Sequence, residues 1–305
     1  MYDIIIVGGG PAGLTAALYA LRANKTVLIL EKAAFGGQMT YSPKIENYPG
    51  YDSISGVDLA DRMVSQVLEQ GADAEPAEVL SVTVDHRGIK HVETDSGAFE
   101  AKAVIVAVGV KHRRLGLPRE EELTGEGVSY CAVCDGAFYA GQAVAVAGGG
   151  NSALQEAVLL SEHCSRVTVV QNLPYFTGED KLVEVLKQKQ NVFFIMDTVI
   201  TGLEGTDSLT GLHLKSSDGT ESTLSVDGLF VAIGLEPENE AFSNVVPLNE
   251  AGYMDVTEQC VTGTPGVFAA GDCRKKTVRQ ITTAVADGAS AALAACRYID
   301  YEFGA

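Results

Sequence analysis

Two segments of the chain share the same order of apolar and polar positions. Residues 3–13, DIIIVGGGPAG, are a run of mostly β-branched apolar residues that ends in glycines, and residues 143–153, AVAVAGGGNSA, repeat this order. Each segment continues into an alanine- and leucine-rich stretch with helical spacing. An apolar run, a glycine turn and a helical stretch predict a buried strand followed by a helix. The chain therefore contains an internal repeat of one strand–turn–helix unit.

Further apolar runs lie late in each copy. Residues 103–109, AVIVAVG, and residues 228–234, GLFVAIG, are typical of buried strands that end in glycine turns. After TPGVFAAGDC, the spacing predicts a helix from about residue 279 to residue 298. Strands that alternate with helices indicate an α/β fold with parallel sheets.

The repeat and the length of the chain predict two domains. At 305 residues, the chain has room for two domains of ordinary size. We expect both to be Rossmann-like, with three layers. The first is predicted to comprise residues 1–111 and 242–305, and the second, residues 112–241, to be inserted into it.

The first glycine turn has the spacing of a dinucleotide site. In Gly8-x-Gly10-x-x-Gly13, the first glycine permits the turn, the second lets the backbone approach a pyrophosphate, and the third lets helix pack on strand. Glu31 ends the next apolar run 18 residues after Gly13, where an acid can hold ribose hydroxyls. This turn therefore predicts dinucleotide binding.

The second glycine turn lacks the partner that the first one has. Gly148-x-Gly150-x-x-Ala153 keeps the glycine spacing, but the residue 18 positions later is Gln171. A site for NAD uses an acid there, and a site for NADP uses arginines nearby. Residues 171–177, QNLPYFT, contain neither. The second domain therefore has the pattern of a nucleotide-binding fold without its usual specificity group. A domain that no longer binds a nicotinamide cofactor tightly explains this pattern at least as well as one that does.

Charge excludes several classes of partner. The chain has 22 Lys plus Arg and 40 Asp plus Glu, a net charge of −18, which disfavours nucleic acid and anionic membrane surfaces. No run reaches the about 18 apolar residues of a membrane helix, and the N-terminus lacks the basic start of a signal peptide. We expect a soluble cytoplasmic protein. Two basic clusters interrupt the acidic chain, residues 111–114 and residues 274–276.

Cys131 and Cys134 form a close pair that Asp135 follows directly. A helix start favours the thiolate of such a pair, and a neighbouring carboxylate can pass a proton to a leaving thiolate. We therefore predict redox chemistry. No second pair or histidine spacing completes a zinc site, so no metal is expected. The remaining cysteines are interpreted as small buried apolar residues: Cys164, Cys260, Cys273 and Cys296.

These motifs together resemble the low-molecular-weight thioredoxin reductases, over essentially the whole chain. The motifs are GGGPAG near the N-terminus, FGGQ at 35–38, ENYPG at 46–50, YCAVCDG at 130–136, GGGNSA at 148–153, GVFAAGD at 266–272 and Arg279-Gln280. The resemblance implies an FAD-binding, two-domain homodimer that reduces the disulfide of thioredoxin. It also implies a set of residues around FAD: Gly8, Gly10, Pro11, Ala12, Gly13, Glu31, Lys32, Gly37, Gln38, Asn47, Val79, Gly271, Asp272, Arg279, Gln280 and Ile281.

The resemblance also implies roles in the reaction. Cys134 would face the flavin, Cys131 would attack the partner disulfide, and Asp135 would act as the acid. A dithiol buried against a flavin cannot at the same time reach a protein disulfide, so the second domain should rotate on linkers near residues 112–116 and 234–242.

The chain departs from the NADPH-dependent members at residues 171–177. Those members carry His-Arg-Arg-x-x-x-Arg, whereas this chain has QNLPYFT, which is similar to the ferredoxin-dependent flavin thioredoxin reductases. Ferredoxin is therefore the leading hypothesis for the electron donor. The two basic clusters would then dock an acidic ferredoxin, unless they are ordinary solvated turns. The alternatives are an NADPH- or NADH-dependent thioredoxin reductase, a flavoprotein dithiol oxidase and, more remotely, a non-enzymatic redox-sensing FAD module.

Overall fold

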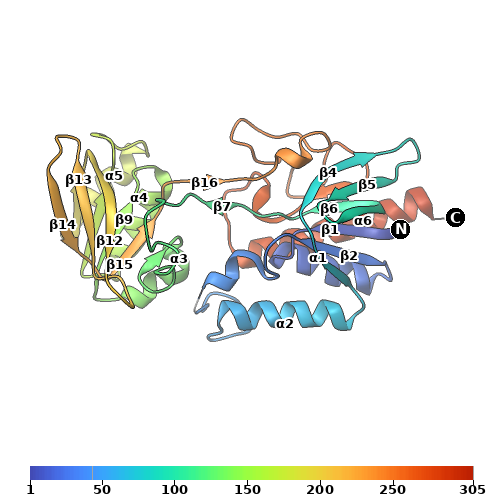
Figure 1. The fold of residues 1–305 in the computed structure, drawn as a ribbon, viewed down its shortest axis with the longest axis horizontal. Coiled ribbons are helices and arrows are strands. Elements are labelled where there is room, and N and C mark those ends of the chain that lie inside the picture. Colours follow the sequence, from blue (N-terminus) through green and yellow to red (C-terminus); the bar gives the residue numbers. More distant parts are fainter. Residues whose placement is uncertain (43, 305) are drawn as a thin grey trace. The chain divides into compact units, whose positions relative to one another are not determined.

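The structure is a computed structural model that describes residues 1–42 and 44–304. It divides into two compact units, whose elements are labelled in Figure 1. Unit 1 comprises residues 1–42, 48–111 and 236–304, and unit 2 comprises Lys44–Asn47 and His112–Leu235.

The start of the last segment of unit 1 differs from the predicted domain boundary at residue 242. The carboxylate of Glu238 pairs with the Nζ atoms of Lys32 and Lys111 at 2.9 Å and 2.8 Å. Asn239 is 1% exposed, and its side chain donates to the backbone oxygens of Gly252 and Cys273. These contacts hold residues 236–241 in unit 1.

Unit 1 is built on a seven-stranded mixed sheet in the order β3-β2-β1-β6-β5-β4, with β17 also pairing with β6. Strands β1, β2, β3, β6 and β17 run parallel, and β4 and β5 form antiparallel pairs. The central strands are buried on both faces, which explains their continuous apolar sequence. The strands are β1 (Tyr2–Val7), β2 (Val27–Glu31), β3 (Asp73–Pro76), β4 (Val79–Val84), β5 (Lys90–Thr94), β6 (Gly97–Val106) and β17 (Val267–Ala269).

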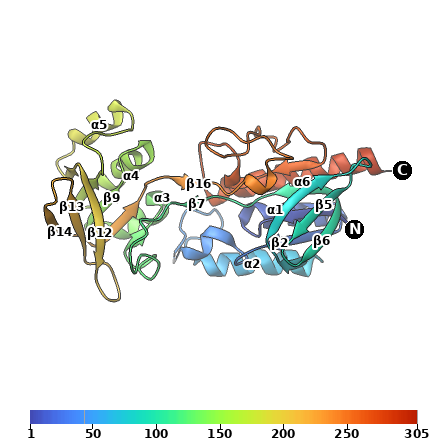
Figure 2. The same cartoon turned by 45° about the horizontal axis from the view of Figure 1, so that its top comes forward.

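Three helices pack on one face of this sheet through a shared apolar core: α1 (Pro11–Arg22), α2 (Gly56–Glu69) and α6 (Ile281–Phe303). All three are labelled in Figure 2. Helix α6 lies so close to α1 that a Cβ atom on Gly288 would be 2.1 Å from the backbone oxygen of Ala12. The opposite face is covered by the loops around the short helix η3 (Glu240–Phe242). The remaining short helices are η1 (Gly37–Tyr41) and η4 (Gly271–Cys273).

Lys90 is a fully buried lysine in β5, with 0% exposure. Its Nζ donates to the backbone oxygen of Gly88 at 2.7 Å and to the Tyr298 hydroxyl at 2.9 Å, and it lies over the Tyr298 ring. Burial lowers the pKa of Lys90 to about 8, because neither neutral partner compensates for the lost water.

This burial predicts a pH-dependent stability. The folded pKa of Lys90 lies below the unfolded one, so the unfolded chain binds more protons between about pH 8 and pH 10.5. The unfolding free energy of the wild type, minus that of Lys90→Met, should therefore rise by up to about 3 kcal/mol across this range. Urea unfolding at a series of pH values checks this. The exposed-site control Lys275→Met should give a flat difference, and a flat difference for Lys90→Met would contradict the expectation.

Unit 2 has three layers. Its five-stranded parallel sheet has the order β11-β10-β9-β15-β8. The helices cover one face, and an antiparallel three-stranded sheet, β12-β13-β14, covers the other. The strands are β8 (Val128–Ser129), β9 (Ala143–Ala147), β10 (Arg166–Val170), β11 (Val192–Ile195), β12 (Thr198–Glu204), β13 (Gly211–Ser216), β14 (Glu221–Ser225) and β15 (Gly228–Val231). The helices are α3 (Ala132–Asp135), η2 (Gly136–Tyr139), α4 (Asn151–Ser161) and α5 (Asp180–Lys187).

The predicted α/β class and the repeated strand–turn–helix unit are confirmed. In each copy the strand that precedes the helix lies at the centre of its sheet and pairs in parallel with both neighbours: β1 precedes α1, and β9 precedes α4. The two linkers pair as short strands, β7 (Lys111–His112) with β16 (Leu235–Glu236), and Arg113 N donates to Gly234 O at 3.0 Å.

Candidate active site

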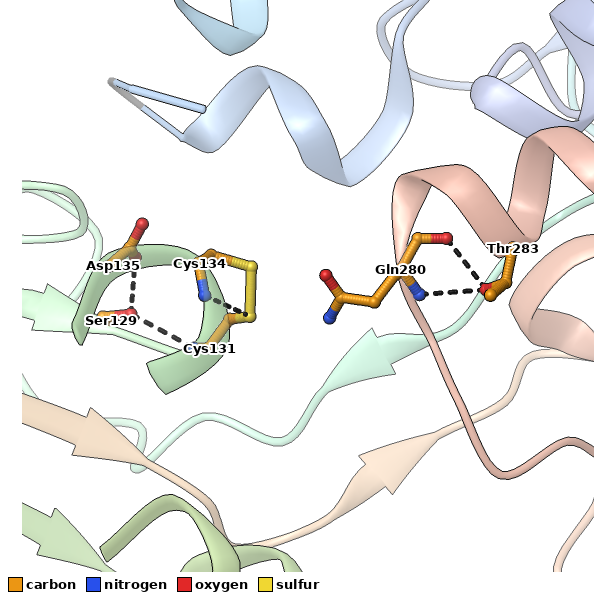
Figure 3. Close-up of a disulfide and its surroundings, with 6 residues drawn as sticks. All are labelled: Ser129, Cys131, Cys134, Asp135, Gln280 and Thr283. Carbon is orange, nitrogen blue, oxygen red and sulfur yellow. Dashed lines mark hydrogen bonds between the residues drawn. A yellow bond between two sulfur atoms is a disulfide. The ribbon is translucent and has the colours of Figure 1, made fainter. Parts of the chain in front are cut away.

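Cys131 and Cys134 form a disulfide at the start of α3, with their Cα atoms 5.3 Å apart (Figure 3). Cys131 is the N-cap residue of this short helix, and its Sγ accepts a hydrogen bond from Cys134 N at 3.2 Å. The backbone oxygen of Cys131 accepts from the N–H groups of Cys134 and Asp135. The turn thus brings both sulfurs together and supplies one N–H donor to a charge on Cys131.

Asp135 is held by Ser129, which the sequence analysis did not identify. The Ser129 hydroxyl donates to Oδ2 of Asp135 at 2.6 Å and accepts from Cys131 N at 3.1 Å, as Figure 3 shows. Ser129 ends β8, so the parallel sheet of unit 2 fixes its position. One hydroxyl group therefore links the carboxylate to the backbone of the Cys pair.

The other four cysteines are free and buried. Burial raises the pKa of Cys164 to about 11 and the pKa values of Cys260 and Cys273 to about 12. A thiol with such a pKa is largely protonated and unreactive at neutral pH. Their interpretation as small buried apolar residues is confirmed.

The first glycine turn lies between β1 and α1. Gly8 has φ +109°, and a Cβ atom there would be 2.3 Å from the backbone oxygen of Ala107. A Cβ atom on Gly13 would be 1.9 Å from the backbone oxygen of Gly8, whereas one on Gly10 would meet nothing nearer than Gly37 Cα at 4.0 Å. The outer two glycines therefore serve packing, and Gly10 leaves the approach to the turn open. Pro11, Ala12 and Gly13 form the first turn of α1.

Glu31 closes β2 beside this turn. Its carboxylate accepts from Gly9 N at 2.7 Å and from Ala33 N at 2.8 Å. The sequence predicts Glu31 as a ribose ligand, and the structure gives it a further function, since it fixes the backbone of the glycine turn. Each carboxylate oxygen retains a free lone-pair direction for a hydroxyl donor.

Further predicted residues of unit 1 lie on nearby elements or at strand ends. Gly37 begins η1 with φ +61°, and a Cβ atom there would be 3.2 Å from Gly10 Cα. Gln38 follows it in η1, and Val79 is buried at the start of β4. Lys32 pairs with Glu78 and Glu238. The predicted residue Asn47 belongs to the short segment of unit 2.

The turn after β17 carries a carboxylate, that of Asp272, with one buried oxygen that lacks a hydrogen bond among the described residues. Oδ1 of Asp272 has no hydrogen-bond partner among the described residues, and the nearest cation is Lys276 Nζ at 3.7 Å. Burial raises the pKa of Asp272 above its ordinary value, against the opposing charge of Lys276. A buried carboxylate oxygen without a hydrogen-bond donor destabilises the folded protein, so Oδ1 of Asp272 is suited to accept a hydrogen bond from a ligand hydroxyl. FAD supplies such hydroxyls on its ribityl chain, and the residues present therefore fit that cofactor.

The remaining predicted cofactor residues begin α6. Gln280 is the N-cap and forms a capping box with Thr283, and Ile281 is the first helical residue. Figure 3 shows the Thr283 hydroxyl bound to the backbone N–H and the backbone oxygen of Gln280. The guanidinium of Arg279 lies over the Tyr253 ring at 4.5 Å, and its buried Nε has no hydrogen-bond partner within the described ranges. This second unsatisfied group again fits an added polar ligand.

The basic cluster at residues 274–276 is mostly buried, so its interpretation as a docking patch is wrong. Arg274 binds both oxygens of Asp287, at 2.8 Å and 2.7 Å. Lys276 Nζ binds Oδ2 of Asp287 at 2.9 Å, and its side chain is 6% exposed. Within this cluster, Lys275 alone has an exposed side chain. This burial could not be predicted from the sequence, because Asp287 lies more than ten residues further along the chain, inside α6.

The second glycine turn, between β9 and α4, is covered by the side chain of Gln171, which directly follows β10. Gln171 is 3% exposed and binds the backbone of Tyr175 and Asn172. A Cβ atom on Gly149 would be 2.4 Å from the Gln171 side chain. Thr177 donates to Gly149 O through its backbone N–H and its hydroxyl. The position that carries the specificity group of a nucleotide domain is therefore occupied by a buried amide.

Comparison with known proteins identifies close relatives. Residues 2–288 match the model of the pyridine nucleotide-disulphide oxidoreductase family. The chain is 42% identical to a thioredoxin reductase from Listeria monocytogenes, over 98% of this chain and 94% of the relative. It is 38% identical to a thioredoxin reductase from Bacillus subtilis, over 98% and 95%. A crystal structure of thioredoxin reductase from Streptococcus pyogenes matches with a TM-score of 0.94 and 39% identity, over 99% of both chains.

Family membership also gives the cofactor. Proteins of this family are FAD flavoproteins, and FAD is the cofactor of this chain. Within the described residues, no helix is long and apolar enough to cross a membrane. The family match, the relatives and the CxxC disulfide agree with one another. The chain belongs to the pyridine nucleotide-disulphide oxidoreductase family and, within it, to the low-molecular-weight thioredoxin reductases.

Proposed function

We propose that this chain is a cytoplasmic, homodimeric disulfide reductase that takes electrons from ferredoxin and delivers them to thioredoxin. The Cys131–Cys134 disulfide on α3 carries the reductase part of this proposal. The uncharged segment at residues 171–177 carries the choice of donor. The names of the relatives support thioredoxin as the substrate.

We infer that unit 1 holds the FAD. The pyrophosphate would lie against the backbone at the start of α1, where helical N–H groups face a ligand and Gly10 leaves room. Glu31 would accept from the ribose, and Oδ1 of Asp272 from a ribityl hydroxyl. When bound, FAD supplies an acceptor and donor of two electrons. The further residues in this proposal are Pro11, Ala12, Lys32, Gly37, Gln38, Asn47, Val79, Gly271, Arg279, Gln280 and Ile281.

The Cys pair would then transfer electrons by thiol–disulfide exchange. The Cys131 thiolate attacks one sulfur of the thioredoxin disulfide, which forms a mixed disulfide and releases the other sulfur as a thiolate. Asp135, oriented by Ser129, holds the proton that this leaving sulfur takes up. The Cys134 thiolate then attacks Cys131 Sγ, and this step restores the Cys131–Cys134 disulfide and releases reduced thioredoxin.

The pair must reach two different partners in one cycle, so we propose that unit 2 rotates on the two linkers. Gly116 has φ +73° and open space around its Cα, and Gly234 has φ +119°. Both positions tolerate backbone conformations that other residues rarely adopt. Such positions suit hinges, which absorb changes in φ and ψ.

The donor assignment rests on the end of β10. A 2′-phosphate needs cationic donors there, and each charge-assisted hydrogen bond contributes about 1.5 to 3 kcal/mol. Residues 171–177 contain no cation, and the Gln171 amide is engaged with Tyr175 and Asn172. The absence of several such bonds would weaken NADPH binding by orders of magnitude.

We expect reduced ferredoxin to bleach the flavin absorbance of the holoenzyme fully, and stoichiometric NADPH or NADH to leave it nearly unchanged. Anaerobic stopped-flow spectra with each donor in turn measure this. Turnover with thioredoxin serves as the control that the protein is active. Prompt bleaching by stoichiometric NADPH would reject ferredoxin as the assigned donor.

A second candidate is an NADPH-dependent thioredoxin reductase, which one observation favours. The turn at Gly148 retains φ +126° and the close backbone approach to Ala232 that a nucleotide-binding turn uses. Helix α4 follows it directly, so its N-terminal N–H groups remain in place. The same spectra separate this candidate from the first.

A further inference from the structure

Glu156 lies on α4, the helix that packs against the helix of the Cys pair. Ala132 of α3 and Ala157 and Leu160 of α4 belong to one buried apolar cluster. A Cβ atom on Gly136, just after α3, would be 3.0 Å from Leu160 Cδ2. The two helices therefore leave little space between them.

The carboxyl group of Glu156 lies beside the redox turn. It accepts a hydrogen bond from the backbone N–H of Ala132, the residue that directly follows Cys131. Its Oε2 atom is buried and has no hydrogen-bond partner within the described part of the chain. A buried carboxyl group with one unsatisfied oxygen is poorly stabilised as an anion.

The surrounding charges favour the neutral form as well. Burial raises the pKa of Glu156, the hydrogen bond from Ala132 lowers it and the carboxylate of Asp135 raises it, with a net pKa of about 7. Other elements packed on α4 carry charged residues, including Asp180 and Lys181 of α5 and Arg166 of β10. Among the described residues, Asp135 is the one whose charge acts on Glu156.

We propose that Glu156 is a positioning residue that takes up a proton when the Cys131–Cys134 disulfide is reduced. On reduction, the S–S bond breaks, and its two sulfurs receive two electrons that come from the electron donor. One sulfur takes a proton, the other remains a thiolate, and the second proton goes to the carboxylate of Glu156. The neutral carboxyl group of Glu156 then adds no second negative charge to that of Asp135 near the thiolate, whereas an ionised Glu156 would disfavour the thiolate. This inference rests on the proposed redox role of the pair.

The pH profile of thiol alkylation tests this. The holoenzyme is reduced with dithiothreitol, freed of reductant anaerobically and treated with iodoacetamide between pH 5 and pH 10. We expect the wild-type rate to show two inflections, one near the pKa of Glu156 and one at the thiol. Glu156→Gln should show the thiol inflection alone, shifted down by about 0.5 to 1 pH unit, and should react about 3- to 10-fold faster just above pH 7.

The control is Glu162→Gln, which removes the acid that pairs with Lys189 just after α4. Its profile should match the wild type. A wild-type profile with one inflection would overturn the inference even if Glu156→Gln failed to fold, and so would identical profiles for the wild type and Glu156→Gln. The assay uses neither ferredoxin nor thioredoxin, so inactivity with those proteins would contradict the proposed function without altering these profiles.

Discussion

Cys134→Ser should lower the rate of thioredoxin reduction at least about a thousandfold, because loss of a reacting nucleophile removes the covalent route. A serine hydroxyl cannot close a disulfide with Cys131, so the second exchange step has no sulfur to perform it. The bound FAD should still be reduced by the electron donor, since the residues proposed to hold FAD do not include Cys134. Thioredoxin turnover and anaerobic flavin bleaching, measured on the same preparation, separate the two steps.

The matched control for this prediction is Cys164→Ser, in the same unit. Cys164 is a buried free thiol just after α4, and burial raises its pKa to about 11. This variant should keep most of the turnover of the wild type. Turnover by Cys134→Ser within tenfold of the wild type would show that the pair is not on the electron path.

Asp287→Ala should reduce the unfolding free energy by about 3 to 5 kcal/mol, the usual range when one partner of a buried ion pair is removed. The side chain of Asp287 is 8% exposed, and it binds both Arg274 and Lys276. Without it, two buried cations lose their shared anion. The Gly271 N–H would lose its acceptor as well, so the turn that carries Asp272 should loosen and FAD should dissociate more readily.

Urea unfolding of the holoenzyme, followed by circular dichroism and flavin fluorescence, measures both effects. The control Asp300→Ala lies on the same helix and removes a carboxylate that is 67% exposed and pairs with Lys25. A surface pair of this kind contributes about 0 to 1 kcal/mol. Equal losses from the two variants would contradict a structural role for the buried cluster.

The charge state of Asp287 adds a dependence on pH. Burial alone would raise the pKa of Asp287, but the hydrogen bonds from Arg274 and Lys276 hold it below its ordinary value. A carboxyl group with a lowered folded pKa stabilises the protein above its unfolded pKa, and this contribution is lost as the pH falls through the folded pKa. The destabilisation caused by Asp287→Ala should therefore shrink in acid.

The sequence predicted the parallel strands well because their signal is local. Strands such as β1 and β9 are buried on both faces, so their continuous apolar runs and the glycines after them appear directly in the sequence. The last helix was predicted to end near residue 298 and in fact continues to Phe303, since no glycine or proline lies between residue 298 and Gly304. The antiparallel sheet β12-β13-β14, which covers one face of unit 2, was not predicted at all.

The parts of the site that were missed depend on contacts between distant residues. Ser129 gains its role from a bond to Asp135 across the turn, and Glu156 from the packing of α4 on α3. The basic run at 274–276 has the appearance of a solvated patch, because sequence shows the charge of a residue but not the partner that buries it. Lys276 illustrates this, since its partner Asp287 lies more than ten residues further along the chain, inside α6.

The burial of the four free cysteines determines which thiols of this protein react with oxidants. Each of the four is buried and largely protonated at neutral pH. Peroxides and reactive disulfides should therefore react first with the reduced Cys131–Cys134 pair. Oxidation of that pair yields the same disulfide that the proposed catalytic cycle itself forms, and the electron donor reverses it. Accidental oxidation of thiols is thereby directed to the pair whose disulfide is already an intermediate of the proposed cycle.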